Sequence, residues 1–224
     1  MAHINIAVDG PAGAGKSTVA RAVAKELDIL YLDTGAMYRA MALKAIRCGV
    51  DPNDEAGVLP LLPNTSITVE YSEGKQHTFL DGEDVTSLIR TEQVSKGASD
   101  IGVIPAVRIK LATLQQEIAR TTDVVMDGRD IGSYVMPDSR HKFYITASVE
   151  VRARRRLMEL NDKGQYIGVC LEDMGKEIDS RDYTDSHREF APLTHVPDAA
   201  LIDTTDMDIP AAVAAVMDKL KDIG

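Results

Sequence analysis

The residues best suited to chemistry lie near the N-terminus, in the segment Gly10-Pro-Ala-Gly-Ala-Gly-Lys16-Ser17. Its G-x-x-x-x-G-K-S spacing is typical of a loop whose small residues let backbone N–H groups point at phosphate oxygens, with the positive end of a helix behind them. Lys16 is predicted to reach the β and γ phosphates, and Ser17 to offer a hydroxyl ligand to Mg²⁺. The nucleotide-binding residues predicted in this loop are Gly10, Pro11, Ala12, Gly13, Ala14, Gly15, Lys16, Ser17 and Thr18.

A glycine-rich turn without a function is the alternative for this segment. The segment follows a predicted strand and precedes a predicted helix, which is the context that phosphate binding requires. The loop alone does not name a reaction, because kinases, GTPases and other ATPases share it. A GTPase would also carry an Asn-Lys-x-Asp segment for guanine, and the sequence contains none. We therefore expect ATP as the nucleotide, together with Mg²⁺.

Arginines recur beside predicted strand ends. Residues 33–39 follow one strand and end in Arg39, and residues 127–130 follow another and include Arg129. Ligands of open α/β sheets bind beyond the carboxyl ends of the strands. One isolated arginine would more simply form a surface ion pair, but several beside a phosphate loop would hold several phosphates at once. We predict that such a cationic site collects Lys16, Arg39, Arg129, Arg181 and Arg188.

Catalysis in such a site needs positioning and charge stabilisation. No general base is required, because the second pKa of a phosphate monoester is about 6 and its oxygen is already ionised near neutrality. The catalytic assignments are Lys16, Arg129, Arg181 and Arg188. Asp127 ends an apolar strand, so it either orients Mg²⁺ together with Ser17 or is an ordinary turn residue.

These residues need a sheet whose strands end at one edge. Short apolar runs predict strands at residues 4–8, 29–32, 124–126, 143–145 and 200–202. Helical spacing is clearest at residues 17–27, 105–121, 148–160 and 209–220. This alternation predicts an α/β fold, a P-loop NTPase-type parallel sheet with helices on both faces. In the second helix, Pro105 is the expected start, and the expected buried stripe is Val107, Leu111, Leu114 and Ile118.

A hairpin interrupts this series. Residues 66–71 and 76–80 alternate polar and apolar side chains around Ser72-Glu-Gly-Lys75, which is the pattern of two antiparallel strands. Since a hairpin does not belong to a βαβ series, we expect it to be a small insertion on the main sheet.

The sequence at this point resembles the bacterial cytidylate kinases, which belong to the nucleoside monophosphate kinases. The matching segments occur in the family's order at residues 10–18, 33–39, 127–130 and 181–193. The resemblance implies ATP-dependent phosphorylation of CMP and dCMP to CDP and dCDP in pyrimidine nucleotide metabolism. It also implies one kinase domain over residues 1–224, with a monophosphate-binding insertion at about 60–100 and a helical lid at about 148–185.

The same resemblance implies roles for individual residues. Ser99, Arg108 and Asp130 would surround cytosine. A carboxylate such as that of Asp130 can accept a hydrogen bond from the N4 amino group of cytosine, whereas uracil presents an oxygen at this position, which the carboxylate would repel. The full set of implied substrate-binding residues is Thr34, Tyr38, Arg39, Ser99, Arg108, Arg129, Asp130, Arg181, Asp185 and Arg188. From the arginine-rich helix, Arg155 or Arg156 would cover ATP when the lid closes, although such a cluster is more often a solvated face.

Composition excludes other classes. The net charge of −10 is the wrong sign for a nucleic acid polymer partner. Cys48 and Cys170 form no C-x-x-C pair and are predicted to be reduced core thiols. Without a signal segment or an apolar run of roughly 20 residues, we expect a cytoplasmic monomer with no membrane partner. Two alternatives stay open: another monophosphate or small-metabolite kinase, and a nucleotide-binding module without phosphoryl transfer, which would not need Arg129, Arg181 and Arg188.

Overall fold

The computed structural model of the chain describes residues 3–72, 74–162, 164 and 168–221. The chain forms two compact units: unit 1 comprises Met1–Tyr31 and Thr122–Gly224, and unit 2 comprises Leu32–Thr121. Among the described residues, none of the helices combines the length and the apolar character that crossing a membrane would require.

A five-stranded sheet forms the centre of unit 1. Its order is β2 (Leu30–Asp33), β6 (Val124–Gly128), β1 (Asn5–Asp9), β7 (His141–Thr146) and β8 (Ala200–Asp203), with Leu30 and Tyr31 of β2 in unit 1. The β1–β6, β1–β7 and β7–β8 pairs are parallel, which confirms the predicted α/β class and all five predicted strands. Because β1 pairs with both β6 and β7, the segments after β1 and β6 leave the same edge of the sheet side by side.

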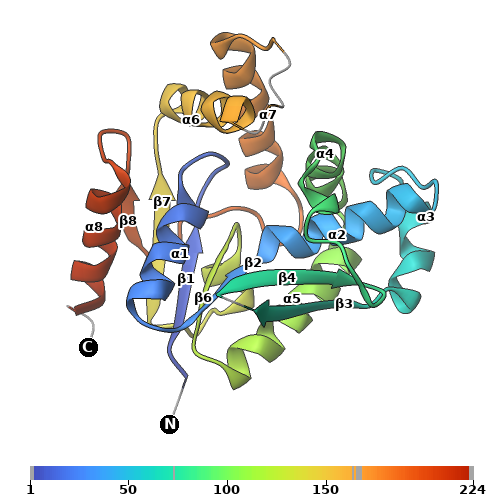
Figure 1. Cartoon of the computed structure of the whole chain (residues 1–224), viewed down its shortest axis with the longest axis horizontal. Coiled ribbons are helices and arrows are strands. Elements are labelled where there is room, and N and C mark those ends of the chain that lie inside the picture. The colour runs from blue at the N-terminus through green and yellow to red at the C-terminus, as the bar shows by residue number, and fades with distance from the viewer. Residues whose placement is uncertain (1–2, 73, 163, 165–167, 222–224) are drawn as a thin grey trace. The chain divides into compact units, whose positions relative to one another are not determined.

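Two helices cover one face of this sheet. Helices α1 (Lys16–Glu26) and α8 (Ile209–Lys221) lie side by side in Figure 1. Their apolar side chains pack on the strands in one core that includes Ile6, Val125 and Val216, all fully or almost fully buried. Removing this much apolar surface from water is the main force that holds the phosphate loop, between β1 and α1, in place.

A second pair of helices in unit 1 forms its own small core. Helices α6 (Val149–Asp162) and α7 (Leu171–His187) pack through Ala153, Leu160, Met174 and Ile178. The short π-helical turn η3 (Ile131–Val135) follows β6. Neither α7 nor η3 was predicted as a separate element from the sequence.

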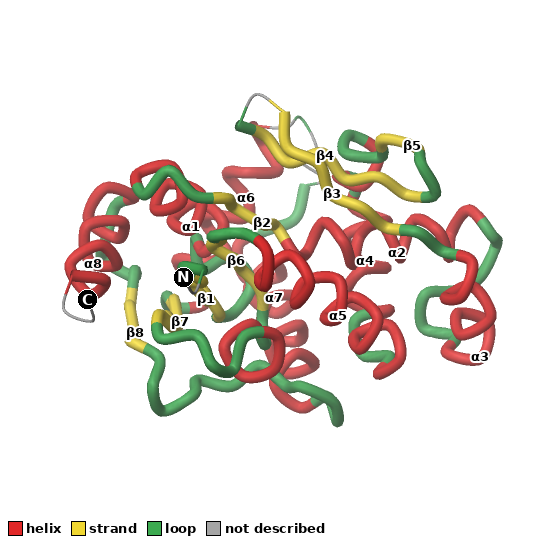
Figure 2. Tube along the Cα trace, turned by 90° about the horizontal axis from the view of Figure 1, so that it is seen from below, coloured by secondary structure: helices red, strands yellow, loops and turns green. Residues whose placement is uncertain are grey.

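Unit 2 combines helices with a small antiparallel sheet. Its helical elements are α2 (Thr34–Arg47), α3 (Glu55–Val58), η1 (Leu59–Asn64), η2 (Leu88–Arg90), α4 (Glu92–Ile101) and α5 (Pro105–Thr121). The sheet has the order β3 (Ile67–Ser72), β4 (Lys75–Leu80) and β5 (Glu83–Asp84), and Figure 2 shows it in yellow. The predicted hairpin is confirmed, because Ile67 pairs with Leu80 and Ser72 with Lys75. Strand β5 was not predicted.

Two expectations about burial were wrong. Cys48 and Cys170 are free but exposed, and each flanks a helix. Cys48 is the C-cap that follows α2, and Cys170 is the N-cap of α7, where its Sγ accepts the N–H of Asp173. Helix α5 does begin at Pro105, but Leu114 and Ile118 are only half-buried. Its buried face is rotated by about one residue and consists of Val107, Arg108, Leu111, Ala112, Gln115 and Ala119.

Candidate active site

The phosphate loop is set by backbone geometry at its glycines. Gly10 has φ +144°, and a Cβ there would lie 1.9 Å from the carbonyl oxygen of Ile145, so only glycine fits. Gly15 has φ +87° and is the N-cap of α1. The loop therefore turns tightly between β1 and α1 and brings Lys16 to the first position of the helix.

Lys16 is buried at the base of this loop, with its Nζ donating to the carbonyl oxygen of Pro11 at 2.7 Å. Burial, followed by the positive charge of Arg129, lowers the pKa of Lys16 to about 7. Asp127 and Asp185 act in the opposite direction. A negatively charged ligand close to Lys16 would therefore raise its pKa again.

We expect this lysine to take up a proton when ATP binds. At pH 8 the amine is mostly neutral in the free protein, and a nearby phosphate would raise its pKa again. Isothermal titration calorimetry at pH 8 in two buffers of different ionisation enthalpy should report an uptake approaching about one proton per ATP. Lys16→Arg keeps its charge at this pH and should show no uptake. Equal uptake in both proteins would contradict the assignment.

Oxygen ligands suited to Mg²⁺ lie next to the loop. The hydroxyl of Ser17 donates to Oδ2 of Asp127 at 2.7 Å, and the hydroxyl of Tyr31 donates to Oδ1 at 2.8 Å. A hydroxyl and a carboxylate in contact fit a cation that binds few protein ligands and keeps several waters. The structure thus brings Ser17 and Asp127 together, and Tyr31 is a third member that sequence reasoning missed. No cluster of three or more His, Cys, Asp or Glu that could hold a metal occurs among the described residues.

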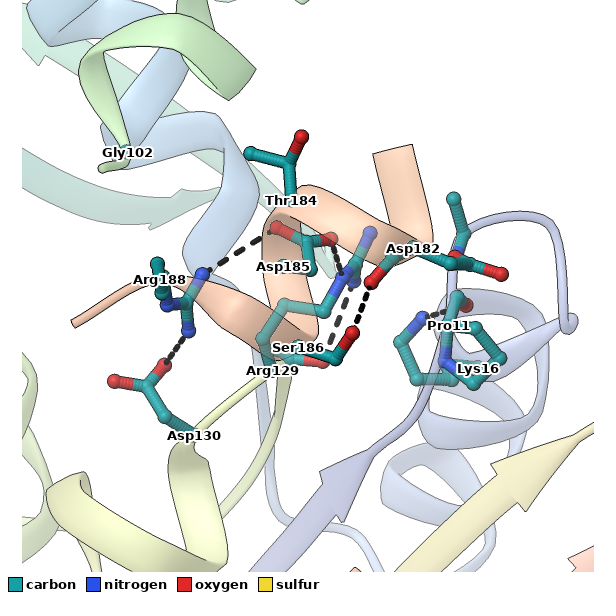
Figure 3. A network of polar contacts seen from close by, with 12 residues as sticks. Pro11, Lys16, Gly102, Arg129, Asp130, Asp182, Thr184, Asp185, Ser186 and Arg188 are labelled. Carbon is teal, nitrogen blue, oxygen red and sulfur yellow. Dashed lines mark hydrogen bonds and ion pairs between the residues drawn. The ribbon is translucent and has the colours of Figure 1, made fainter. Parts of the chain in front are cut away.

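Arginines and acids meet in one buried network beside the loop, which Figure 3 shows. Nε of Arg129 donates to Oδ2 of Asp185 at 2.7 Å, and Nη1 of Arg188 lies 3.4 Å from Oδ1 of the same residue. Nη2 of Arg188 lies 3.7 Å from Oδ1 of Asp130, and both of these side chains are almost fully buried. Asp185 on α7 therefore joins this helix to the segment that follows β6.

The charges of this network hold each other ionised. Burial alone would raise the pKa of Asp185, but Arg129 and Arg181 together with Arg188 outweigh it and leave that pKa below the ordinary value. Arg181 also lies close enough to lower the pKa of Lys16. The predicted residues Lys16, Arg129, Arg181, Asp185 and Arg188 are therefore neighbours within unit 1.

Helices α6 and α7 contact the phosphate loop through an ion pair. Arg152 and Asp182 pair with each other, and both reach the backbone of Ala12: Nη1 of Arg152 donates to its carbonyl oxygen at 3.1 Å, and Oδ1 of Asp182 accepts its N–H at 3.4 Å. Sequence reasoning assigned neither residue a role. The one available signal was that Arg152 lies one turn before the predicted lid arginines.

The two lid arginines proposed for ATP differ in position. Nη1 of Arg155 donates to the hydroxyl of Thr204 at 3.0 Å and lies 3.4 Å from the carbonyl oxygen of Ala14, so it adjoins the loop. Arg156 pairs with Glu159 on its own helix at 3.0 Å. Arg155 is therefore the better placed of the two, and its contact with ATP stays a prediction.

Unit 2 holds its own arginine cluster around Asp33. One carboxylate oxygen of Asp33 accepts from Arg39 at 2.8 Å and from Arg90 at 3.0 Å, while the other caps α2 by accepting the N–H of Ala36. Burial tends to raise the pKa of Asp33, but the two guanidinium groups bring it below its usual value. Gln76 of β4 accepts the N–H of Asp33 at 2.7 Å. Asp33 and Arg90 were not assigned as site residues from the sequence.

The remaining predicted residues of unit 2 lie on α2, α4 and α5. Arg108 is 2% exposed, its Nη1 donates to the carbonyl oxygen of Gly102 at 2.9 Å, and its guanidinium carbon lies 5.3 Å from the ring centre of Tyr38. Ser99 lies one turn before Gly102 on α4 and is half-buried. Thr34 is buried at the start of α2. The structure thus brings Arg108 together with Tyr38.

A phosphate loop at the end of β1, flanked by buried arginines, defines the class as a P-loop kinase. A sequence profile described as cytidylate kinase matches residues 6–222. The chain therefore belongs to the cytidylate kinase family.

Relatives and one solved structure agree with this. Cytidylate kinase from Pelotomaculum thermopropionicum is 51% identical, over 95% of this chain and 94% of its own. That from Caldicellulosiruptor bescii is 45% identical over 97% and 96%. The structure of an uncharacterized protein from Eubacterium ventriosum matches with a TM-score of 0.55 at 12% identity, over 98% of this chain and 99% of the other. The last comparison supports the fold alone.

Proposed function

We propose that the protein transfers the γ-phosphoryl group of ATP to CMP and dCMP, giving ADP with CDP or dCDP. The observation that carries this proposal is the buried network next to Lys16, in which Arg129 and Arg188 share Asp185. A module that only binds ATP would need cationic groups for one polyphosphate. A kinase acting on a monophosphate needs them for two.

Transfer requires the two reacting oxygens and the phosphorus in line, with the charge on the moving group held by cations. Lys16 binds the β and γ phosphates during the transfer, and Arg129 and Arg188 bind the acceptor phosphate. Arg181 and Asp185 face the sugar and the transferred group. The acceptor phosphate oxygen attacks the γ phosphorus, the bond to the β-bridging oxygen breaks, and ADP leaves with that oxygen ionised.

Mg²⁺ would be held by the hydroxyl of Ser17 and by Asp127, either directly or through water. When bound, it neutralises charge on the phosphate oxygens. Tyr31 keeps the carboxylate of Asp127 oriented through its hydroxyl, as outer partners of metal ligands do.

Base recognition is proposed for Asp130, Arg108 and Ser99. Asp130 accepts the N4 amino group of cytosine, and Arg108 donates to the ring acceptors. Asp130 is 4% exposed within unit 1, so a base without a donor facing this carboxylate would leave a buried polar group unpaired. Thr34, Tyr38 and Arg39 are proposed as further contacts to the monophosphate.

A coupled ADP-release assay with purified protein tests this function against CMP, dCMP, UMP, AMP and GMP. The expected result is turnover with CMP and dCMP well above the others. Lys16→Met is the matched control, because its ADP release should fall to background with every acceptor. Equal turnover across the panel, or none, would refute the proposed acceptor.

A further inference from the structure

The turn that follows Asp130 is capped in an unusual way. Residues 131–135 form η3, whose first N–H groups have no partner within the turn. The residue before such a turn commonly accepts them with its own side chain. Asp130 occupies that place, but it makes no such capping bond.

The carboxylate of Asp9, at the end of β1, accepts these N–H groups in place of Asp130. Its Oδ1 accepts the N–H of Ile131 at 2.8 Å, and its Oδ2 accepts the N–H of Gly132 at 2.7 Å. Both distances are those of charge-assisted hydrogen bonds. Asp9 is 6% exposed and immediately precedes Gly10, so one side chain ties the start of the phosphate loop to the segment that carries Arg129 and Asp130.

The ionised form of Asp9 is unfavourable at this buried position. Burial raises the pKa of Asp9 to about 6; the N–H groups of Gly132 and Ile131 oppose this, Asp130 adds to it, and Lys16 opposes it. A neutral cap would avoid the cost of burying one carboxylate near another. The carboxylate of Asp130 makes no capping bond to its own turn, and its Oδ1 lies 3.7 Å from Nη2 of Arg188.

We propose that Asp9 is a positioning residue for base selection: it caps η3 from β1 and thereby holds the carboxylate of Asp130 in the place where it accepts the amino group of the acceptor base. This rests on the proposed cytidylate kinase activity. Asp9 itself touches neither base nor phosphate in this proposal, and it acts through Asp130.

Asp9→Asn tests this with little change in shape. Ile131 and Gly132 donate to different oxygens of Asp9. In asparagine an NH₂ group takes the place of one of these oxygens and faces an N–H donor, so the turn must shift. The ratio of kcat/KM for CMP to that for UMP is expected to fall roughly tenfold or more, since small displacements of a recognition group can cost up to about 100-fold. KM for ATP should stay within about twofold. Because CMP and UMP share sugar and phosphate, a general loss of activity cancels in the ratio.

Four further proteins complete the test: a control, the two additional variants of a double-mutant cycle, and a substitute for Asp9→Asn. Asp123→Asn is the matched control: this exposed acid accepts the N–H of Ile4 at 2.8 Å, and its loss should leave the ratio unchanged. In a double-mutant cycle, Asp9→Asn should change the ratio little once Asp130 is already Asn. If Asp9→Asn does not fold, as judged by circular dichroism, Gly132→Ala presses on the same contact, since its Cβ would lie 3.3 Å from Oδ2 of Asp9 and 3.3 Å from the flexible side chain of Lys142.

The outcomes separate the two claims. A wild-type protein without preference for CMP over UMP refutes the proposed function and this inference with it. A wild-type preference that persists in Asp9→Asn, or in Gly132→Ala where that variant replaces it, refutes the positioning role alone. Equal effects of Asp9→Asn with and without Asp130→Asn refute it as well, because Asp9 would then not act through Asp130.

Discussion

Arg188→Met is expected to lower kcat/KM for CMP by roughly 10²- to 10³-fold, the cost of removing one donor that stabilises developing charge. The guanidinium is 4% exposed, its Nε donates to the carbonyl oxygen of Ala191 at 2.8 Å, and it faces both Asp130 and Asp185. Methionine has no charge, so the acceptor phosphate loses one cation. Asp130 and Asp185 each lose one cationic neighbour, although Asp185 keeps Arg129. Steady-state kinetics, with circular dichroism to confirm folding, measure the effect.

Arg154→Met is the matched control for this change. Arg154 is also a helical arginine paired with an acid, Glu150, but its side chain is 63% exposed. Exposed pairs of this kind contribute little, so activity should stay within about twofold of wild type. A loss of less than tenfold in folded Arg188→Met would contradict the role given to this arginine.

Asp130→Asn is also expected to have a large effect, but on the preference for CMP over UMP and not on the rate with CMP. The amide can donate a hydrogen bond to the oxygen at position 4 of uracil, which the carboxylate would repel. A buried polar site discriminates strongly between two bases only while its hydrogen-bonding groups match one of them. The ratio of kcat/KM for CMP to that for UMP should therefore fall by roughly 10²-fold or more when Asp130 becomes Asn. Competition assays with both monophosphates in one reaction measure the ratio directly.

Asp138→Asn supplies the control, since Asp138 follows η3 and is exposed. Its ratio should equal that of the wild type. If the Asp130→Asn protein turns over CMP and still rejects UMP as strongly as the wild type, base selection does not depend on this residue.

The parts of the site that were predictable from sequence are those set by local rules. The phosphate loop needs small residues at fixed spacing between a strand and a helix, so Lys16 and Ser17 could be assigned from residues close to them in the chain. Asp127 could be placed near them because parallel strands end at the same edge, and the register confirms it by pairing Val8 with Asp127. Here the sequence pattern and the tertiary structure impose the same constraint.

Other parts depend on contacts between distant residues. Asp9 reaches Ile131 and Gly132 across more than a hundred residues, and nothing in the local sequence marks it as their cap. Helix α7 contributes Leu171, Met174 and Ile178 to the core that it shares with α6, at helical spacing but only in its first half. Residues 179–187 hold no aliphatic side chain, so the sequence pattern predicts no helix of this length.

The sequence also did not predict which charged side chains are buried. Arg152 and Arg154 look alike in a basic stretch, yet Arg152 is 5% exposed and bonded to Ala12, whereas Arg154 faces solvent. Arg108 lies in the buried face of α5, where an apolar pattern would place a leucine. A composition pattern counts such arginines as surface residues, because unpaired charges are rarely buried.

The contact at Gly10 limits how this loop can change. A side chain there would meet the carbonyl oxygen of Ile145, which every amino acid carries, and not the side chain of Ile145. No replacement at position 145 can therefore make room for alanine at position 10. Suppressors of a Gly10 defect would have to move the backbone of β7, and with it the parallel pairing to β1 that sets the register of the whole site.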